Sequence, residues 1–200
     1  MADISEKCPS GHTPVSLSTS KERVWAREVA LHAHAGQLDK TGEPYIRHCQ
    51  RVAEAVDGDK AKSVAFLHDV VEKGAGWTSE RLLDSGFSQE VVAAVDSLTH
   101  RPGETKDALT IRAASNPLAV VVKRADLLDN LAQMEKQGKD GTEYRRRLAL
   151  LDVAHDLRLD GLGESATTLR GEAPAGRVAR NGLALLLMAA VAIIYFTLRP

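Results

Sequence analysis

Apolar side chains recur at helical spacing along most of this chain, and that spacing excludes most fold classes. No segment sustains the two-residue alternation that is typical of a half-buried strand. The helical segments are KERVWAREVALHAHAGQ (21–37), PYIRHCQRVAEAV (44–56), DKAKSVAFLHDVVEK (59–73), SQEVVAAVDSLTH (88–100), PLAVVVKRADLLDNLAQM (117–134) and TEYRRRLALLDVAHDLRL (142–159). We therefore predict an all-α fold, with one helical domain over residues 20–160.

Two prolines support this prediction, and one segment is ambiguous. Pro44 and Pro117 stand at the start of apolar-periodic segments, where a proline is well tolerated at the first helical position. The run VVVKRADLL (120–128) is rich in valine and is also compatible with a strand. Its length and its continuation as Asp-Leu-Leu-Asp-Asn favour a buried helix.

The two ends of the chain differ from this body. Residues 1–19 mix serine, threonine, proline and acids, so we expect a flexible arm. Residues 161–181 lose the helical periodicity and are rich in small residues, so we expect a linker.

The C-terminal segment NGLALLLMAAVAIIYFTL (181–198) contains 18 residues without a charge. At 1.5 Å per residue such a helix covers roughly 27 Å, enough for a thin bilayer. We predict a single transmembrane helix over residues 182–198; the alternative is a buried C-terminal helix. Arginines are more frequent before this segment than after it, so the helical domain is expected to be cytoplasmic, with a C-terminal membrane anchor.

Charge and cysteine content exclude several kinds of partner and site. The formal net charge of the chain is −1, so we expect no nucleic acid partner. Cys8 and Cys49 are far apart in sequence, which fits neither a disulfide framework nor a thiolate zinc site. A reducing cytosol is the simplest environment for the body of the protein.

Metal-ligand residue types interrupt three of the apolar helical segments. These residues are His34, the adjacent pair His68 and Asp69, and Asp126. Each alone is more often an ordinary core or surface residue, but burying them together is costly unless a cation or hydrogen bonds compensate. Two imidazoles and two carboxylates suit Mn²⁺, Fe²⁺ or Zn²⁺ in a site with open positions for water and phosphate oxygens.

The order of the motifs resembles a known family. AHAGQLDKTGEPYIRH, then LHDVVE, then TH, then VVKRADLLDN are similar to the HD-domain metal-dependent phosphohydrolases, over about Val24 to Leu131. Within that family the motifs resemble the RelA/SpoT-type branch and its small stand-alone relatives, which remove the 3′-pyrophosphate of guanosine tetraphosphate alarmones.

This resemblance implies an HD-domain helical bundle and assigns roles to individual residues. It implies that His34, His68, Asp69 and Asp126 are the metal ligands, usually for manganese. It also implies that Glu72 helps to activate water and that Asn130 belongs to the substrate site.

Lys73 departs from the family pattern, which continues His-Asp-x-x-Glu-Asp. The lysine places a positive charge where the family has a negative one. Lys73 is therefore a second candidate catalytic residue beside Glu72: it can hold a phosphate oxygen, lower the pKa of Glu72, or point to solvent. The segment ADLLDN also differs from the Ala-Asp-Arg-Leu-His-Asn of the long alarmone enzymes.

The turn KTGEPYIR supplies the remaining site candidates. Lys40 and Arg47 flank it and are predicted to contact phosphate, helped by backbone N–H groups if a helix begins at Pro44. The alternative is that both are solvated loop residues. Tyr45 and His48 either line the same pocket or pack in the core.

Three functional hypotheses follow. The first is metal-dependent hydrolysis of a phosphorylated nucleotide, with guanosine 3′,5′-bis(diphosphate) as the substrate suggested by the resemblance, by a protein anchored in the membrane. The second is a catalytically impaired, membrane-tethered module that binds the metal and the nucleotide and has a regulatory role. The third is a structural membrane adaptor, which would bind no metal. The sequence gives no basis for predicting the oligomeric state.

Overall fold

The computed structural model describes residues 18–169 of the chain, with side chains up to residue 159. These residues form nine α-helices and one isolated antiparallel β-bridge, between Leu38 and Pro44. The helices are α1 (Thr19–Ala33), α2 (Ile46–Glu54), α3 (Asp59–Leu67), α4 (Val70–Lys73), α5 (Ser79–Asp84), α6 (Gln89–Leu98), α7 (Lys106–Ala113), α8 (Pro117–Lys136) and α9 (Thr142–Leu169). The predicted all-α fold is confirmed for the described part of the chain.

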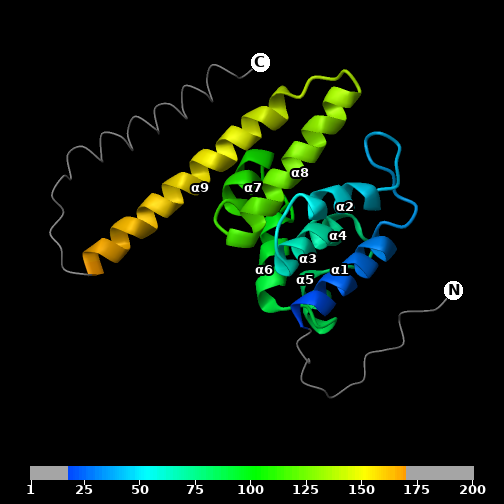
Figure 1. The fold of residues 1–200 in the computed structure, drawn as a ribbon, viewed down its shortest axis with the longest axis horizontal. Coiled ribbons are helices and arrows are strands. Elements are labelled where there is room, and N and C mark those ends of the chain that lie inside the picture. Colours follow the sequence, from blue (N-terminus) through cyan, green and yellow to red (C-terminus); the bar gives the residue numbers. More distant parts are fainter. Residues whose placement is uncertain (1–17, 170–200) are drawn as a thin grey trace.

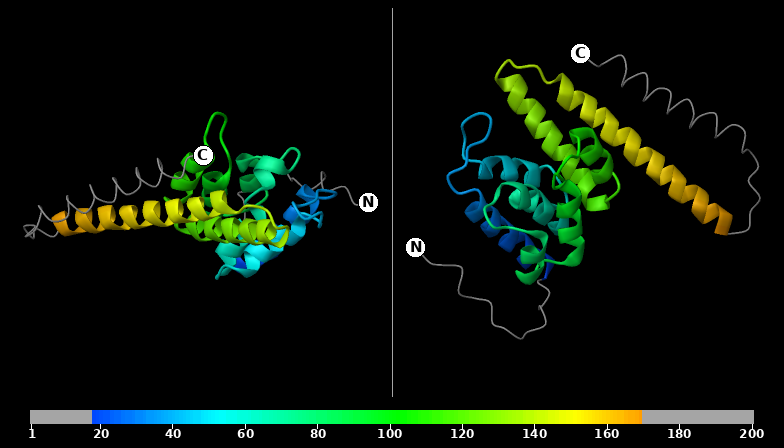
Figure 2. Two further views of the ribbon diagram at one scale, coloured as in Figure 1. Left: turned by 90° about the horizontal axis from the view of Figure 1, so that it is seen from above. Right: turned by 180° about the vertical axis from the view of Figure 1, so that it is seen from behind.

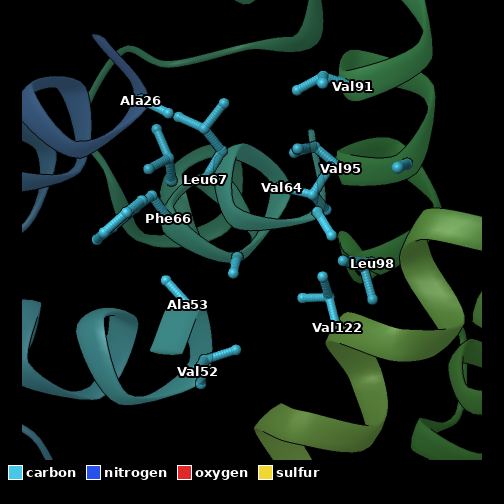
Figure 3. Packing of buried hydrophobic residues seen from close by; sticks show 14 of the residues in the cluster. Ala26, Val52, Ala53, Val64, Phe66, Leu67, Val91, Val95, Leu98 and Val122 are labelled. Carbon is cyan, nitrogen blue, oxygen red and sulfur yellow. The ribbon is translucent and has the colours of Figure 1, made fainter. Parts of the chain in front are cut away.

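Helix α3 lies at the centre of the domain and packs against α1, α2, α6 and α8. Figure 3 shows Val64, Phe66 and Leu67 of α3 surrounded by side chains from these neighbours, among them Ala26 and Val122. Five of the nine residues of α3 are buried apolar residues, so no face of this helix is left for solvent over most of its length. A helix that is apolar on nearly every side has to be covered by other helices, and this requirement fixes the arrangement of the bundle.

Helices α8 and α9 form a long antiparallel pair on one side of the body. α9 packs against α7 and α8, and its C-terminal part extends beyond them (Figures 1 and 2). Leu151 of α9 is fully buried against Val120 and Leu127 of α8 in a second, smaller apolar cluster. This pairing places Arg145, in the first turn of α9, beside Glu135 at the end of α8, and Asp152 beside Arg124 near the middle of α8.

The six predicted helices are present, with three differences. The predicted helix over 59–73 is interrupted at His68 and Asp69, which separate α3 from α4. Helices α5 and α7 are short and were not predicted as periodic segments. α9 continues to Leu169, so the first part of the predicted linker is helical.

The two prolines behave differently. Pro117 occupies the first turn of α8, and Asn116 caps that helix by accepting hydrogen bonds from the N–H groups of Leu118 and Ala119. The prediction for Pro44 is wrong, because α2 begins two residues later, at Ile46. Pro44 instead closes the β-bridge with Leu38 and shapes the loop before α2.

Within residues 18–169, no helix combines the length and hydropathy required to cross a bilayer. Residues 1–17 of the predicted arm over 1–19, residues 170–181 of the predicted linker and the predicted transmembrane helix over 182–198 lie outside the described residues.

Candidate metal centre

Three side chains of the types that bind metal ions converge where the first turn of α2 meets the C-terminal end of α3. His48, His68 and Asp69 each offer an atom within 4.8 Å of the other two. The Nε2 atoms of His48 and His68 are 3.3 Å apart, and Asp69 Oδ2 lies 3.2 Å from His68 Nε2. Asp126 of α8 joins them, with its Oδ1 3.4 Å from His48 Nε2 and 3.9 Å from His68 Nε2.

The break between α3 and α4 explains how His68 and Asp69 face one point. His68 follows the last residue of α3, and Asp69 precedes the first residue of α4 with φ −109° and ψ −1°. In a continuous helix these two side chains would diverge by about 100°. The turn between the helices removes that constraint, so adjacent residues can contribute to the same centre.

The Nδ1 atoms of the two histidines are bonded away from the centre. His68 Nδ1 lies 2.7 Å from the carbonyl oxygen of Ala65, and His48 Nδ1 lies 2.7 Å from Asp129 Oδ2. Because both acceptors require a proton on Nδ1, each ring has its lone pair on Nε2, facing the centre, whenever it is in the neutral form. This arrangement is usual for histidines that bind a metal ion.

Asp129 is itself held firmly. Arg51 donates to its Oδ1 from Nε at 2.6 Å, and Gln133 donates to its Oδ2 at 2.5 Å. These bonds, with the one to His48, lower the pKa of Asp129 to about 2 although burial acts in the opposite direction. The orientation of the His48 ring is therefore fixed by a supporting network.

The carboxylates and the imidazole of His48 stabilise each other's charges. Burial alone would lower the pKa of His48, but Asp126 and Asp129 raise it to about 9. Burial would raise the pKa of Asp126, but Lys123 and His48 hold it far below its usual range. Asp126 and Asp129 thus surround the imidazole of His48 with negative charge.

The residues that converge fit a divalent metal ion. Donor atoms bound to one ion at about 2.0–2.2 Å lie at most about 4.4 Å from each other. Four of the six distances between the donor atoms of His48, His68, Asp69 and Asp126 are between 3.2 and 3.9 Å, shorter than that limit. Two imidazole nitrogens and two carboxylate oxygens are the donor set expected for Mn²⁺, Fe²⁺ or Zn²⁺.

His34, predicted as a ligand, is not in this group of converging side chains, and His48, which the sequence left open, is. His34 donates from Nδ1 to Gln37 Oε1 at 3.0 Å, and its ring packs against Tyr45 with centroids 4.8 Å apart. Its Nε2 is buried and has no hydrogen-bond partner. One feature of the sequence could have pointed to His48 in place of His34: His48 lies inside an amphipathic helix directly after the GEPYIR turn.

A cavity of about 380 Å³ borders the centre. The metal-ligand candidates line one part of it, and Lys40, Asn130 and Tyr144 line another. Lys40 donates to Asn130 Oδ1 at 2.5 Å and to the hydroxyl of Tyr144, and Asn130 donates to Asp126 Oδ1 at 2.5 Å. The predicted substrate-site residues Lys40 and Asn130 are therefore joined to the centre by hydrogen bonds.

Helices α7 and α9 add residues that the sequence analysis missed. Lys106, Tyr144 and Arg147 line the cavity from these two helices. Arg147 is mostly enclosed and pairs with Glu143 at 2.9 Å. These residues lie outside the motifs that resemble the family, and only the packing of α9 against α7 and α8 brings them to the cavity.

Arg47 does not reach the cavity. Its side chain is exposed and its guanidinium lies 3.4 Å from Gln50 Oε1. The backbone N–H groups predicted to bind an anion are also used: that of Arg47 donates to Pro44 and that of His48 donates to Tyr45. The structure thus gives Arg47 no place in the lining of the cavity, and the helix start predicted at Pro44 lies at Ile46.

Glu72 and Lys73 both line the cavity. Glu72 Oε2 accepts a hydrogen bond from the backbone N–H of His100 at 3.2 Å. Lys73 donates to Asp69 Oδ2 at 2.7 Å and to the hydroxyl of Tyr45. Of the three interpretations of Lys73, the one in which its side chain points to solvent is therefore wrong.

Comparison with known proteins places this site in a family. Residues 26–159 match the HD domain, which is more than half of the chain and includes every residue of the centre. A probable GTP pyrophosphokinase of Mycobacterium leprae is 36% identical over an alignment of 150 residues, and the match covers 66% of this chain and 19% of that protein. A probable guanosine-3′,5′-bis(diphosphate) 3′-pyrophosphohydrolase of Synechocystis is 32% identical over 135 residues, 60% of this chain and 17% of that protein.

This chain thus spans about a fifth of the length of the curated relatives that it matches. A solved structure, of a metazoan SpoT orthologue described as hydrolysing ppGpp, superposes with a TM-score of 0.53 at 21% sequence identity. The match covers 72% of this chain and 98% of that one, and it shows the same fold. The chain belongs to the HD domain family, and its resemblance to the RelA/SpoT-type branch of that family is confirmed.

Proposed function

We propose that this protein is a metal-dependent hydrolase of a phosphorylated nucleotide. The observation that carries the proposal is the placement of His48, His68, Asp69 and Asp126 along a cavity that also presents Lys40. One part of the cavity is built to hold a cation and another to hold an anion. A phosphorylated substrate needs both.

The ligands of the ion would be His48, His68, Asp69 and Asp126, with Mn²⁺ preferred by family resemblance and Fe²⁺ or Zn²⁺ as alternatives. A divalent ion bound in such a site lowers the pKa of a water molecule and polarises a phosphoryl oxygen. Glu72 is the candidate general base or water-orienting group, because its carboxylate lines the cavity and is fixed by the N–H group of His100.

The anionic part of the substrate would contact Lys40, with Asn130 beside it. Lys106 and Arg147 add positive charge to the cavity from α7 and α9. Guanosine 3′,5′-bis(diphosphate) is the first substrate to test, since the Synechocystis relative is named a 3′-pyrophosphohydrolase of that compound and the metazoan protein of similar fold is described as hydrolysing ppGpp. Other relatives are named pyrophosphokinases, so the nucleotide and the bond that is cleaved belong to the proposal.

A panel of nucleotides with Mn²⁺, Fe²⁺ or Zn²⁺ tests this function. The purified protein should release pyrophosphate or phosphate from at least one member of the panel, guanosine 3′,5′-bis(diphosphate) included. His68→Ala provides the control, because it removes an Nε2 donor from the centre. Equal release by the protein and by this variant, across all nucleotides and metals, would refute the proposal.

A second candidate function is a regulatory module that binds the metal and the nucleotide without efficient hydrolysis. The ion pair between Lys73 and Asp69 favours it, because an ammonium group occupies the place where the related enzymes carry a carboxylate. Lys73→Asp separates the two candidates. Hydrolysis that appears only in this variant would identify the protein as a regulatory module, whereas hydrolysis by the unaltered chain would identify it as an enzyme.

We also propose that residues 182–198 anchor the protein in a membrane, with the HD domain on the cytoplasmic side. The support for this anchor is the long uncharged segment and the preceding arginines. Centrifugation of cell extracts tests it: the full chain should sediment with membranes and require detergent for release. A chain that stays in the high-speed supernatant would contradict the anchor and leave the HD domain function unaffected.

A further inference from the structure

Each carboxylate of the candidate centre is paired with a lysine of the same helix or turn. Lys73 lies 2.7 Å from Asp69 Oδ2, and Lys123 lies 3.0 Å from Asp126 Oδ2. Two carboxylates and two ammonium groups carry no net charge, so a divalent cation at this centre would meet no excess of negative charge from these four groups. Because cations repel each other strongly where solvent is partly excluded, a lysine that stays at either carboxylate opposes metal binding.

The two lysines differ in their freedom to withdraw. Lys123 projects from the long helix α8 and its side chain is 14% exposed, whereas Lys73 ends the four-residue helix α4 and its side chain is 37% exposed. A flexible lysine at the surface can turn its ammonium group into water at low cost. Lys123 cannot do so without disturbing the packing of α8, so Lys73 is the one that can yield.

Lys73 also competes for an atom that the metal would use. Asp69 Oδ2, which accepts from Lys73, is the oxygen that lies 3.2 Å from His68 Nε2. Tyr45 strengthens the competing arrangement: its hydroxyl accepts from Lys73 and donates to the same oxygen, and the ammonium group lies 4.6 Å from the centre of its ring. Asp69 is thus already neutralised by this chain's own cation at the position where it would bind the ion.

We propose that Lys73 is a built-in competitor of the metal ion, which holds Asp69 until a divalent cation displaces it. Lys73 thereby weakens metal binding and makes it depend on the free metal concentration. This inference rests on the proposed function, because it assumes that the centre takes a divalent cation. It assigns Lys73 a role in metal loading that is separate from any contact with substrate.

Calorimetric titration of the full chain with Mn²⁺, after removal of metals with a chelator, tests the competition. Lys73→Met keeps the length of the side chain and removes its charge, so the Kd for Mn²⁺ should fall by about tenfold or more. Lys73→Arg keeps the charge and should leave the Kd within about threefold of the unaltered value. Lys60→Met is the matched control, since it breaks a lysine–carboxylate pair with Glu90 away from the centre and should not change the Kd.

Thermal unfolding provides a second readout that does not depend on activity. Without metal, Lys73→Met should unfold at a slightly lower temperature, because Asp69 loses a partner. With saturating Mn²⁺ its increase in Tm should exceed that of the unaltered protein, because tighter binding to the folded state gives more stabilisation. An increase that is equal in the two proteins would count against the competition.

The outcomes separate this inference from the proposed function. If the unaltered protein binds Mn²⁺ and Lys73→Met binds it with the same or lower affinity, the competition is refuted and the proposed function stands. If neither protein binds Mn²⁺, Fe²⁺ or Zn²⁺, both proposals fail. A gain in affinity that Lys60→Met reproduces would also refute the competition, because it would reflect the overall charge of the chain.

Discussion

Asp69 and Asp126 face the same centre but are supported in opposite ways. Asp69 lies in the turn between α3 and α4, and its lysine partner belongs to a single helical turn. Asp126 lies in the middle of the 20-residue helix α8, and its lysine partner is enclosed. The centre therefore has an adjustable half around Asp69 and a fixed half around Asp126.

The fixed half is also the better connected one. Asn130 donates to both the carboxylate and the carbonyl oxygen of Asp126, at 2.5 Å and 2.8 Å, and His48 links Asp126 to the network around Asp129. Around Asp69, Tyr45 and Lys73 supply the hydrogen bonds. In such a site the donor atoms of the fixed half are already in place before the ion binds, while the other half can rearrange to admit the ion.

Removing each carboxylate in turn is the strongest way to test this difference. Asp126→Asn leaves the enclosed ammonium of Lys123 without its partner and should reduce the free energy of unfolding by about 3–5 kcal/mol. Asp69→Asn frees Lys73, which can turn to solvent, and should cost about 1 kcal/mol. Urea denaturation of the metal-free proteins measures both. Equal losses would show that the two halves are equally fixed.

The histidines sharpen the comparison, because His48 lies among the converging side chains and the predicted ligand His34 does not. His48→Ala removes an Nε2 donor from the fixed half and should weaken Mn²⁺ binding by about 100-fold, or roughly 3 kcal/mol. His34→Ala should weaken it by about tenfold at most, as expected for a residue that packs beside the centre. The exposed His32 supplies the control, His32→Ala, in the same calorimetric titration. A larger loss in His34→Ala than in His48→Ala would restore the assignment made from sequence.

The fold was largely predictable from sequence because helical periodicity is a local property. Each long segment, such as 117–134, carries enough apolar residues to reveal its period. The break at His68 and Asp69 was not predictable in this way, since the periodicity of FLHDVVE continues across it. Helix α5 has only six residues, too few to show a period against its neighbours.

The site was predictable in part, and the residues that were missed escaped prediction for two different reasons. His68, Asp69 and Asp126 stand out because they interrupt apolar segments. His48 has the same chemistry, but its helix also contains Arg47 and Arg51, so a further polar residue gives no contrast. Tyr144 and Arg147 reach the cavity only through the docking of α9, which is a tertiary contact that no local pattern encodes.

The part of the cavity that is proposed to hold the substrate is joined to the fixed half by hydrogen bonds. Changing it should have a smaller effect than changing the metal ligands. Lys40 donates to Asn130, which in turn donates to Asp126. If Lys40 binds a phosphate group, Lys40→Met should raise KM about tenfold and leave kcat nearly unchanged, because it removes ground-state and transition-state binding alike. The exposed Lys139 provides the control variant, Lys139→Met. A fall in kcat without a change in KM would instead place Lys40 close to the reacting atoms.

An enclosed ion pair outside the centre shows whether enclosure alone accounts for the fixed half. Glu104 and Arg112 lie 2.6 Å apart, and their side chains are 12% and 18% exposed, similar to those of Asp126 and Lys123. Hydrogen bonding to Arg112 lowers the pKa of Glu104 from 4.5 to about 2. The folded state therefore favours the charged carboxylate, so this pair stabilises the fold above pH 4.5 and loses that effect as the pH falls towards 2.

Glu104→Gln should accordingly cost about 1 kcal/mol at pH 6, and the difference from the unaltered protein should shrink as the pH falls from 4.5 to 2. Urea denaturation at several pH values measures this difference. If Glu104→Gln reduced the free energy of unfolding at pH 6 as much as Asp126→Asn does, any enclosed ion pair in this domain would stabilise the fold equally. In that case the rigidity of the Asp126 half would follow from burial alone and would have no special connection with the metal centre.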